Sequence, residues 1–261
     1  MPAPDAARGS PPPLTLPHLD PLAIELTLAI QGGDFQLLRR LLAERPELAS
    51  VHMIGRHGIE GGYRTPLHAA ADWPGYFPGA PASVALLLEA GADPNENGGG
   101  GETPLHWAAS SDDVDVAEAL IDGGAALDTP GGTIGTIGTP LDNAVGYGCW
   151  HVARLLVARG APVNGLWNAA ALGMLTRLEE LLAVTPPPTQ ADLDEAFWQA
   201  CHGGQLRAAR RLLAAGADTN ASPHYANGQS ALEIAVHPDT RREQLATWLG
   251  EHAATPSGES S

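Results

Sequence analysis

The sequence predicts an all-α fold, a solenoid of stacked helix-turn-helix units. The first observation is repetition: the stretches TPLHAAADW, TPLHWAASS and TPLDNAVGY begin at Thr65, Thr103 and Thr139, and each is followed by a second apolar segment such as VALLLEAGADPN. The second observation is composition, because 44% of the 261 residues are hydrophobic but only 5% are aromatic. A core made mostly of Ala, Leu and Val lets helices pack closely in thin layers.

Each copy also carries signals for the start and the end of its helices. A threonine hydroxyl can cap a helix N-terminus, and a proline at the first helical position loses no hydrogen bond. Glycine favours the left-handed conformation that ends many helices. The predicted starts are Thr65–Pro66, Thr103–Pro104 and Thr139–Pro140, and the predicted ends of the second helices are Gly91, Gly124, Gly160 and Gly216.

The same two-helix pattern extends in both directions and predicts seven units within residues 21–250. The first, fifth and seventh units are degenerate, and TPPPTQADL follows the fifth in place of a Gly-rich connection. Residues 1–20, rich in Pro and Ala, and residues 251–261, small and polar, are expected to be disordered. The units lie near residues 22–64, 65–102, 103–138, 139–165, 166–192, 193–229 and 230–250.

The stretches TPLHAAA, TPLHWAA and LLLEAGADPN resemble ankyrin repeats, whose pattern carries T-P-L-H-x-A and a later G-A-D. The resemblance is strongest over residues 65–164 and 209–220. It implies a curved stack of helix pairs with projecting β-finger loops, and a concave face made by the fingers and the first helices. The first and last units would be caps. The Gly-rich stretch GGTIGTIGTP fits a β-hairpin finger, since it lacks the lysine of a phosphate loop.

The resemblance places the residue after T-P-L-H, and those near the turn between the helices, on the concave face. Trp107 and Tyr147 are the strongest binding candidates, because clustered exposed aromatics usually mark contacts. Trp73 could instead anchor its loop, and Trp150 could pack between units. Trp167 and Trp198 fall at the His position of their units and could be wholly structural. The candidate binding residues are Trp73, Trp107, Asn143, Tyr147, Trp150, Asn168, Gln199 and His202.

Asp142 stands where the other copies carry histidine. The resemblance implies that His68 and His106 bridge adjacent loops by hydrogen bonds rather than act in catalysis. A carboxylate in the first turn of a helix is stabilised by the helix dipole and by free N–H groups, so a capping role is the simpler interpretation of Asp142. The alternative is acid–base chemistry in which Asp142 faces His106 or His202, with Asp72 as a further carboxylate.

Charge and composition exclude several classes of function. A net charge of −16 and a pI near 4.8 disfavour nucleic acid and anionic membranes as main partners. All 14 basic residues are arginine, which excludes Schiff-base chemistry on lysine. Two cysteines are too few for a disulfide framework or a cysteine zinc site, and His52, His57 and His68 lack a metal-binding spacing. No metal or cofactor is therefore expected.

Location and assembly follow from similar arguments. No apolar run approaches the length of a membrane helix, and the first residues lack the apolar stretch of a signal peptide, so a cytoplasmic protein is expected. The polar caps of the family imply a monomer.

The leading interpretation is a non-catalytic recognition protein that binds a protein or peptide partner on its concave face. The alternative is a small-molecule pocket in the same groove, with hydrolase, isomerase or cyclase chemistry based on Asp142 and His106 or His202. A structural spacer without a specific ligand is the third interpretation.

Overall fold

The computed structural model describes residues 12–55, 62–132, 138–237 and 242–253. It separates into two compact units, residues 1–140 and 141–261, which are described in turn. The described residues form an all-α repeat fold in which short helices follow one another in pairs. Among them, no helix combines the length and the apolar character needed to cross a membrane.

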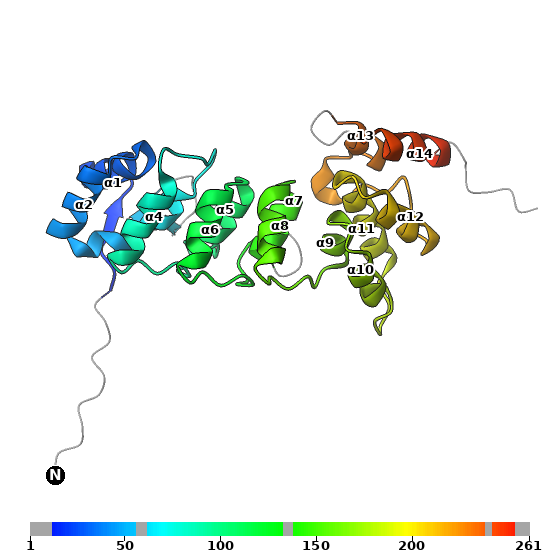
Figure 1. The fold of residues 1–261 in the computed structure, drawn as a ribbon, viewed down its shortest axis with the longest axis horizontal. Coiled ribbons are helices and arrows are strands. Elements are labelled where there is room, and N and C mark those ends of the chain that lie inside the picture. Colours follow the sequence, from blue (N-terminus) through cyan, green and yellow to red (C-terminus); the bar gives the residue numbers. More distant parts are fainter. Residues whose placement is uncertain (1–11, 56–61, 133–137, 238–241, 254–261) are drawn as a thin grey trace, which may run out of the picture. The chain divides into compact units, whose positions relative to one another are not determined.

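The N-terminal unit contains three such pairs, whose helices follow one another in chain order (Figure 1). Within it, α1 packs on α2 and α3, and α4 packs on α6. The first helices of the second and third pairs are short, with their prolines at the first helical position. The helices are α1 (Pro21–Gly32), α2 (Phe35–Glu44), α3 (Pro66–Ala70), α4 (Ala80–Glu89), α5 (Pro104–Ser110) and α6 (Val114–Asp122), with a 3-10 turn η1 (Pro46–Ser50) after α2.

A small three-stranded sheet corrects the prediction that residues 1–20 are disordered. Strand β1 (Thr15–Pro17) lies parallel to β2 (His52–Ile54), which pairs antiparallel with β3 (Tyr63–Arg64). Hydrogen bonds to the distant strand β2 order this segment although its own composition favours disorder. Residues 1–11 lie outside the described part of the chain.

The C-terminal unit holds four pairs of helices, which begin at the boundary between the units. Helix α11 packs on α9, α12 and α13, and α13 packs on α14, which places α11 at the centre of the last three pairs. The helices are α7 (Pro140–Gly146), α8 (Trp150–Ala158), α9 (Leu166–Ala171), α10 (Leu175–Leu182), α11 (Gln190–His202), α12 (Leu206–Ala214), α13 (Ala231–Val236) and α14 (Glu243–Ala253), with a 3-10 turn η2 (His224–Ala226).

Two helix bounds in this unit differ from the predicted ones. Helix α11 begins at Gln190, inside the stretch TPPPTQADL and before the predicted sixth unit (193–229), because Thr189 and Asp192 cap its first turn reciprocally. Helix α14 reaches Ala253, so the predicted disordered tail from residue 251 is wrong at its start. The hydrophobic residues Leu245, Trp248 and Leu249 are buried and hold this helix on the unit. Residues 254–261 lie outside the description.

The predicted caps explain where many of the helices begin and end. Thr65 and Thr103 form capping boxes with the histidines three residues later. The glycines that close the second helices have φ between 95° and 104°, the left-handed conformation predicted for Gly91, Gly124, Gly160 and Gly216. The predicted finger GGTIGTIGTP includes residues 133–137, which lie outside the described residues.

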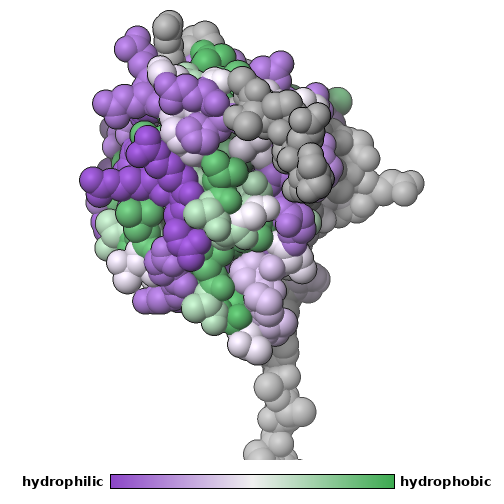
Figure 2. All heavy atoms as spheres, turned by 90° about the vertical axis from the view of Figure 1, so that its right-hand side faces the viewer, coloured by the Kyte–Doolittle hydropathy of each residue, from purple (hydrophilic) through white to green (hydrophobic). Residues whose placement is uncertain are grey.

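The core consists mainly of small aliphatic side chains from both helices of each pair. Alanines and leucines dominate, and Phe197 on α11 is the largest fully buried side chain. Viewed from the right-hand side of Figure 1, the molecule shows a hydrophobic band between hydrophilic areas (Figure 2).

Candidate functional site

The two histidines of the repeated motif are structural bridges. The Nδ1 atom of His68 accepts a hydrogen bond from the backbone N–H of Thr65, so Nε2 carries the proton and donates to the carbonyl of Glu102, 2.9 Å away. His106 does the same with Thr103 and the carbonyl of Gly138. Burial lowers the pKa of His68 to about 4, which keeps its ring neutral at pH 7. The predicted bridging role is confirmed.

Trp198 performs this bridging role in the sixth repeat. Its indole Nε1 donates to the carbonyl of Gln229 at 2.8 Å. Gln229 directly precedes Ser230, which caps α13, just as Glu102 precedes the capping Thr103. An indole N–H therefore links this repeat to the start of the next helix, as an imidazole does in the second and third repeats.

Replacing Trp198 with Phe should destabilise the docking of α13 and α14. The variant removes the donor to Gln229 while keeping an aromatic ring, and an unmade buried hydrogen bond costs about 1–3 kcal/mol. We expect faster amide hydrogen exchange in α13 and α14 than in wild type, with unchanged exchange in α9. Equal exchange rates in the variant and the wild type would show that this hydrogen bond does not stabilise the docking of α13 and α14.

Asp142 forms a hydrogen bond across two repeats. It is 6% exposed, and its Oδ1 accepts from the side-chain amide of Asn168 on α9 at 2.7 Å. The carboxylate of α7 thus contacts the next first helix through a side chain rather than a loop carbonyl. Both the capping role of Asp142 and its pairing with His106 or His202 in catalysis remain predictions.

Three of the predicted binding residues are buried. Asn143 on α7 and Gln199 on α11 are fully buried, and Asn168 is 3% exposed. Gln199 donates through Nε2 to the hydroxyl of Tyr225 at 3.0 Å, and Asn168 bonds to Asp142. Asn168 and Gln199 therefore act as polar links inside the C-terminal unit.

The other candidates in the C-terminal unit gather around the ring of His202. Trp150 and Trp198 lie against it, with ring centroids 5.0 and 5.2 Å from that of the imidazole. Its Nδ1 is 3.3 Å from Oε1 of Gln199. Burial, and to a lesser degree His237, lowers the pKa of His202 to about 4, so this ring is neutral at pH 7. Tyr147 near the end of α7 is 59% exposed.

A chain of hydrogen bonds leads from this aromatic group to the surface. The hydroxyl of Tyr225, which Gln199 contacts, donates to Oε1 of Glu195 at 2.9 Å. Burial, with a contribution from the nearby Glu195 carboxylate, raises the pKa of the Tyr225 phenol and keeps it protonated. The phenol therefore acts as a neutral donor that fixes one oxygen of Glu195.

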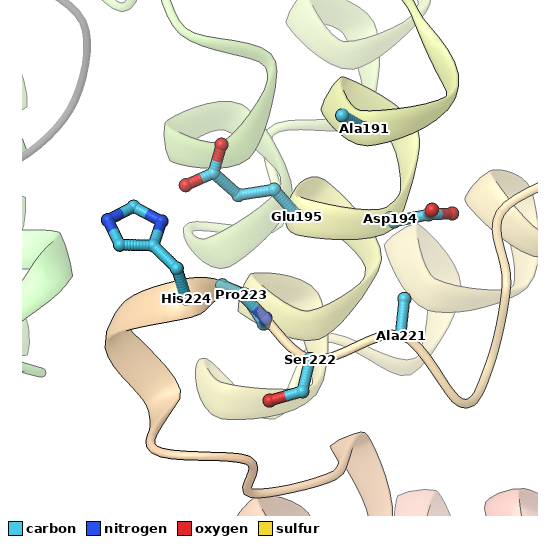
Figure 3. A pocket seen from close by; sticks show the side chains of 7 residues that line it. All are labelled: Ala191, Asp194, Glu195, Ala221, Ser222, Pro223 and His224. Carbon is cyan, nitrogen blue, oxygen red and sulfur yellow. The ribbon is translucent and has the colours of Figure 1, made fainter.

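Glu195 lines a pocket between the first turns of α11 and the loop before η2 (Figure 3). This α11 pocket has a volume of about 310 Å³. The Glu195 carboxylate and the His224 imidazole extend toward the same side, whereas Asp194 points the other way (Figure 3). The residues that line the α11 pocket are Ala191, Asp194, Glu195, Ala221, Ser222, Pro223 and His224.

The N-terminal unit exposes a separate group of aromatic side chains. Trp73 and Tyr76, in the loop between α3 and α4, are 77% and 59% exposed. Tyr76 is held by hydrogen bonds to the α5–α6 turn, from its backbone N–H to Asp113 and from its hydroxyl to the carbonyl of Asp112. Trp107 on α5 is half-buried and packs edge-on against His68. We call Trp73, Tyr76 and Trp107 the aromatic patch.

Asp72, a candidate catalytic carboxylate, has a structural partner. Its Oδ2 lies 2.9 Å from Nη1 of Arg64 in a buried ion pair, and its Oδ1 accepts from the backbone N–H of Trp73 at 3.0 Å. It therefore supports the base of the loop that carries Trp73. Of the histidines considered as metal ligands, His68 is a bridge, His52 contacts Glu96, and His57 lies outside the described residues.

Sequence reasoning missed several residues of these surfaces. Tyr76 stands in the insertion after Asp72, where its aromatic character was the only signal. Glu195, His224 and Tyr225 belong to the sixth repeat and the loop after it, and no recurring motif marks them. The capping pair Thr189 and Asp192 could have revealed that α11 begins early enough to bring Glu195 to the pocket.

A family model matches part of this repeat architecture. Residues 76–165 match a family model described as ankyrin repeats in three copies. The structure is similar to the ankyrin repeat domain of human ASB11, with 23% sequence identity, coverage of 89% of this chain and 99% of that one, and a TM-score of 0.49. No curated protein matches the chain. The chain therefore contains ankyrin repeats over residues 76–165, and the capped start of α3 with its histidine bridge, just before this range, follows the same pattern.

Proposed function

We propose that this protein recognises a protein or peptide partner through aromatic side chains on the concave face of its repeats. Ankyrin repeats generally mediate protein–protein interaction, and solenoids offer extended concave surfaces for it. The observation that carries the proposal is the aromatic patch, in which Trp73 leaves 77% of its surface exposed. A cluster of exposed apolar side chains on a folded surface typically marks a contact site.

The aromatic patch is held in position before any partner binds. The backbone N–H of Trp73 donates a hydrogen bond to the Asp72 carboxylate. Tyr76 donates hydrogen bonds to the Asp113 carboxylate and to the carbonyl of Asp112. Gly75 lies between Trp73 and Tyr76, and a Cβ atom at this position would come within 3.1 Å of the side chain of Ser111, the C-cap of α5. A rigid aromatic anchor loses little conformational entropy on binding, which is why such residues dominate the binding energy at interfaces.

The C-terminal unit offers a second set of contacts. Tyr147 is exposed. Trp150, three residues later, is half-buried and packs against the half-buried His202. The buried amides Asn143, Asn168 and Gln199 support this surface from within rather than touching a partner directly. We place the protein in the cytoplasm as a monomer, without a metal or cofactor, as the sequence predicts.

The proposal is tested by identifying the partner and then measuring its affinity. Native mass spectrometry of the protein purified gently from its own cells should show a co-purifying polypeptide. With that polypeptide purified, Trp73→Ala is expected to weaken binding at least tenfold, in the range of an aromatic hot spot. Trp107→Ala and Tyr147→Ala should weaken it less, because less of Trp107 is exposed and Tyr147 belongs to the second set of contacts.

Val236→Ala is the control, since it also removes exposed apolar surface but lies outside the predicted binding residues. It should bind like wild type. Unchanged affinity in Trp73→Ala, Trp107→Ala and Tyr147→Ala, with all three folded, would refute the proposed surface. A co-purifying ligand of a few hundred daltons instead of a polypeptide would favour the small-molecule alternative.

A further inference from the structure

We propose that the α11 pocket accepts an arginine side chain of the bound partner. This inference rests on the proposed function and specifies the chemistry of the segment that the C-terminal unit recognises. The pocket is formed by Ala191, Asp194, Glu195, Ala221, Ser222, Pro223 and His224 (Figure 3), and its volume of about 310 Å³ is ample for one guanidinium group with part of its stem.

The charge of the pocket is negative and is not balanced by the protein. Oδ1 of Asp194 accepts from the side-chain amide of Gln190 and the backbone N–H of Asp218, and Oε1 of Glu195 accepts from Tyr225. All three donors are neutral. Within the described residues, neither carboxylate forms an ion pair with an arginine or a histidine. A cationic ligand would form an ion pair with these carboxylates and neutralise their charge.

Glu195 is prepared for a directed contact. The Tyr225 hydroxyl fixes Oε1, and no hydrogen bond within the described residues occupies Oε2. Tyr225 is itself held by Gln199, which is fully buried. The orientation of the carboxylate is therefore set by the half-buried Tyr225 and the buried Gln199 before a ligand arrives, which lowers the entropic cost of binding.

The remaining lining favours arginine over lysine. The His224 imidazole is exposed and extends to the same side as the Glu195 carboxylate (Figure 3). A planar guanidinium can stack on such a ring while donating to the carboxylate, whereas a compact, strongly hydrated ammonium cannot stack. Pro223, Ala191 and Ala221 supply apolar surface for the methylene stem. The net charge of −16 would also attract a basic segment over a distance.

The test is an NMR titration of the full chain with Nα-acetyl-L-arginine amide at pH 8 and low ionic strength. Nα-acetyl-L-citrulline amide, which has nearly the same shape without the charge, is the matched probe. Saturable shifts are expected in the His224 ring and in the backbone amides of Ser222 and Tyr225. The dissociation constant should be on the order of 1 mM for arginine and at least tenfold weaker for citrulline.

Glu195→Gln is the diagnostic variant, because glutamine keeps an oxygen acceptor for Tyr225 while removing the charge. Arginine should bind it roughly tenfold more weakly than wild type. Glu180→Gln makes the same change of net charge on α10, outside the pocket, and should behave like wild type. An unaltered amide spectrum away from the pocket will verify that both variants are folded.

Three results would overturn the inference: no saturable shifts with the arginine probe, equal affinity for arginine and citrulline, or equal affinity in wild type and Glu195→Gln. This readout is independent of the partner-binding test of Trp73, which concerns the N-terminal unit. If the arginine probe fails while Trp73→Ala still weakens partner binding, only the pocket assignment falls. Loss of the aromatic-patch effect alone would remove the proposed surface and leave the pocket in place.

Discussion

Replacing Phe197 with alanine is expected to lower the free energy of unfolding of the C-terminal unit by about 3–5 kcal/mol, the range for truncating a buried phenylalanine. Phe197 is fully buried on α11, and its ring centroid lies 6.4 Å from that of Trp248 on α14. Helix α11 also contacts α9, α12 and α13, so the cavity would weaken several interfaces together. Urea unfolding followed by circular dichroism gives the loss.

The matched control is Val184→Ala, which removes aliphatic surface at a position that is 47% exposed. Its effect should stay within about 0.5 kcal/mol, as for most surface substitutions. Hydrogen exchange should show that α13 and α14 lose protection first in Phe197→Ala, because their contacts depend on α11. A loss below about 1 kcal/mol would mean that the neighbouring helices close the cavity.

Asp72→Ala is expected to destabilise the N-terminal unit by about 3 kcal/mol. Arg64 and Asp72 are 8% and 9% exposed, and the substitution removes the carboxylate from a buried guanidinium that lies 2.9 Å away. It also removes the acceptor for the Trp73 N–H, which should loosen the loop of the aromatic patch. Chemical unfolding measures the first effect, and hydrogen exchange in the loop measures the second.

Two further variants separate charge from hydrogen bonding. Asp72→Asn can keep an acceptor for the Trp73 N–H without the charge, so an intermediate loss of stability is expected. Glu47→Ala breaks the ion pair between Arg45 and Glu47, whose side chains are 43% and 49% exposed, and should leave stability unchanged because solvent screens such pairs. Equal effects of Asp72→Ala and Glu47→Ala would show that burial of the Arg64–Asp72 pair has no energetic consequence.

The parts of the fold that could be predicted are those determined by neighbouring residues. The capping of Thr65 and Thr103 depends on a histidine three residues later, and the left-handed glycines depend on the helix they close. Because the motif recurs and a second apolar segment follows each copy, the sequence also predicts that the helices occur in pairs. The strand Thr15–Pro17 could not be found in this way, because its order comes from hydrogen bonds to residues 52–54.

The candidate site was less predictable for the same physical reason. The concave positions of the family were assigned by counting from the repeated motif, and counting gives no measure of burial. Asn143, Asn168 and Gln199 occupy such positions but are enclosed by their neighbours. The contact of Gln199 with Tyr225 spans 26 residues and depends on the conformation of the loop before η2. The sequence predicts Trp73 as a binding residue, but only the structure shows the hydrogen bonds that hold its loop.

The exchange of histidine for tryptophan at position 198 gives two of the joints between repeats a different response to acid. Below pH 6.5 an unfolded chain binds a proton on His68, whereas the folded ring resists protonation until about pH 4, so acid favours unfolding of that joint across this interval. Protonation at Nδ1 would also oppose the N–H of Thr65 that this atom accepts. The indole of Trp198 has no ionisable group, and its hydrogen bond to Gln229 is indifferent to pH over the same range. The same molecule thus links successive repeats by one hydrogen bond that acid weakens, that of His68, and by one that acid leaves unchanged, that of Trp198.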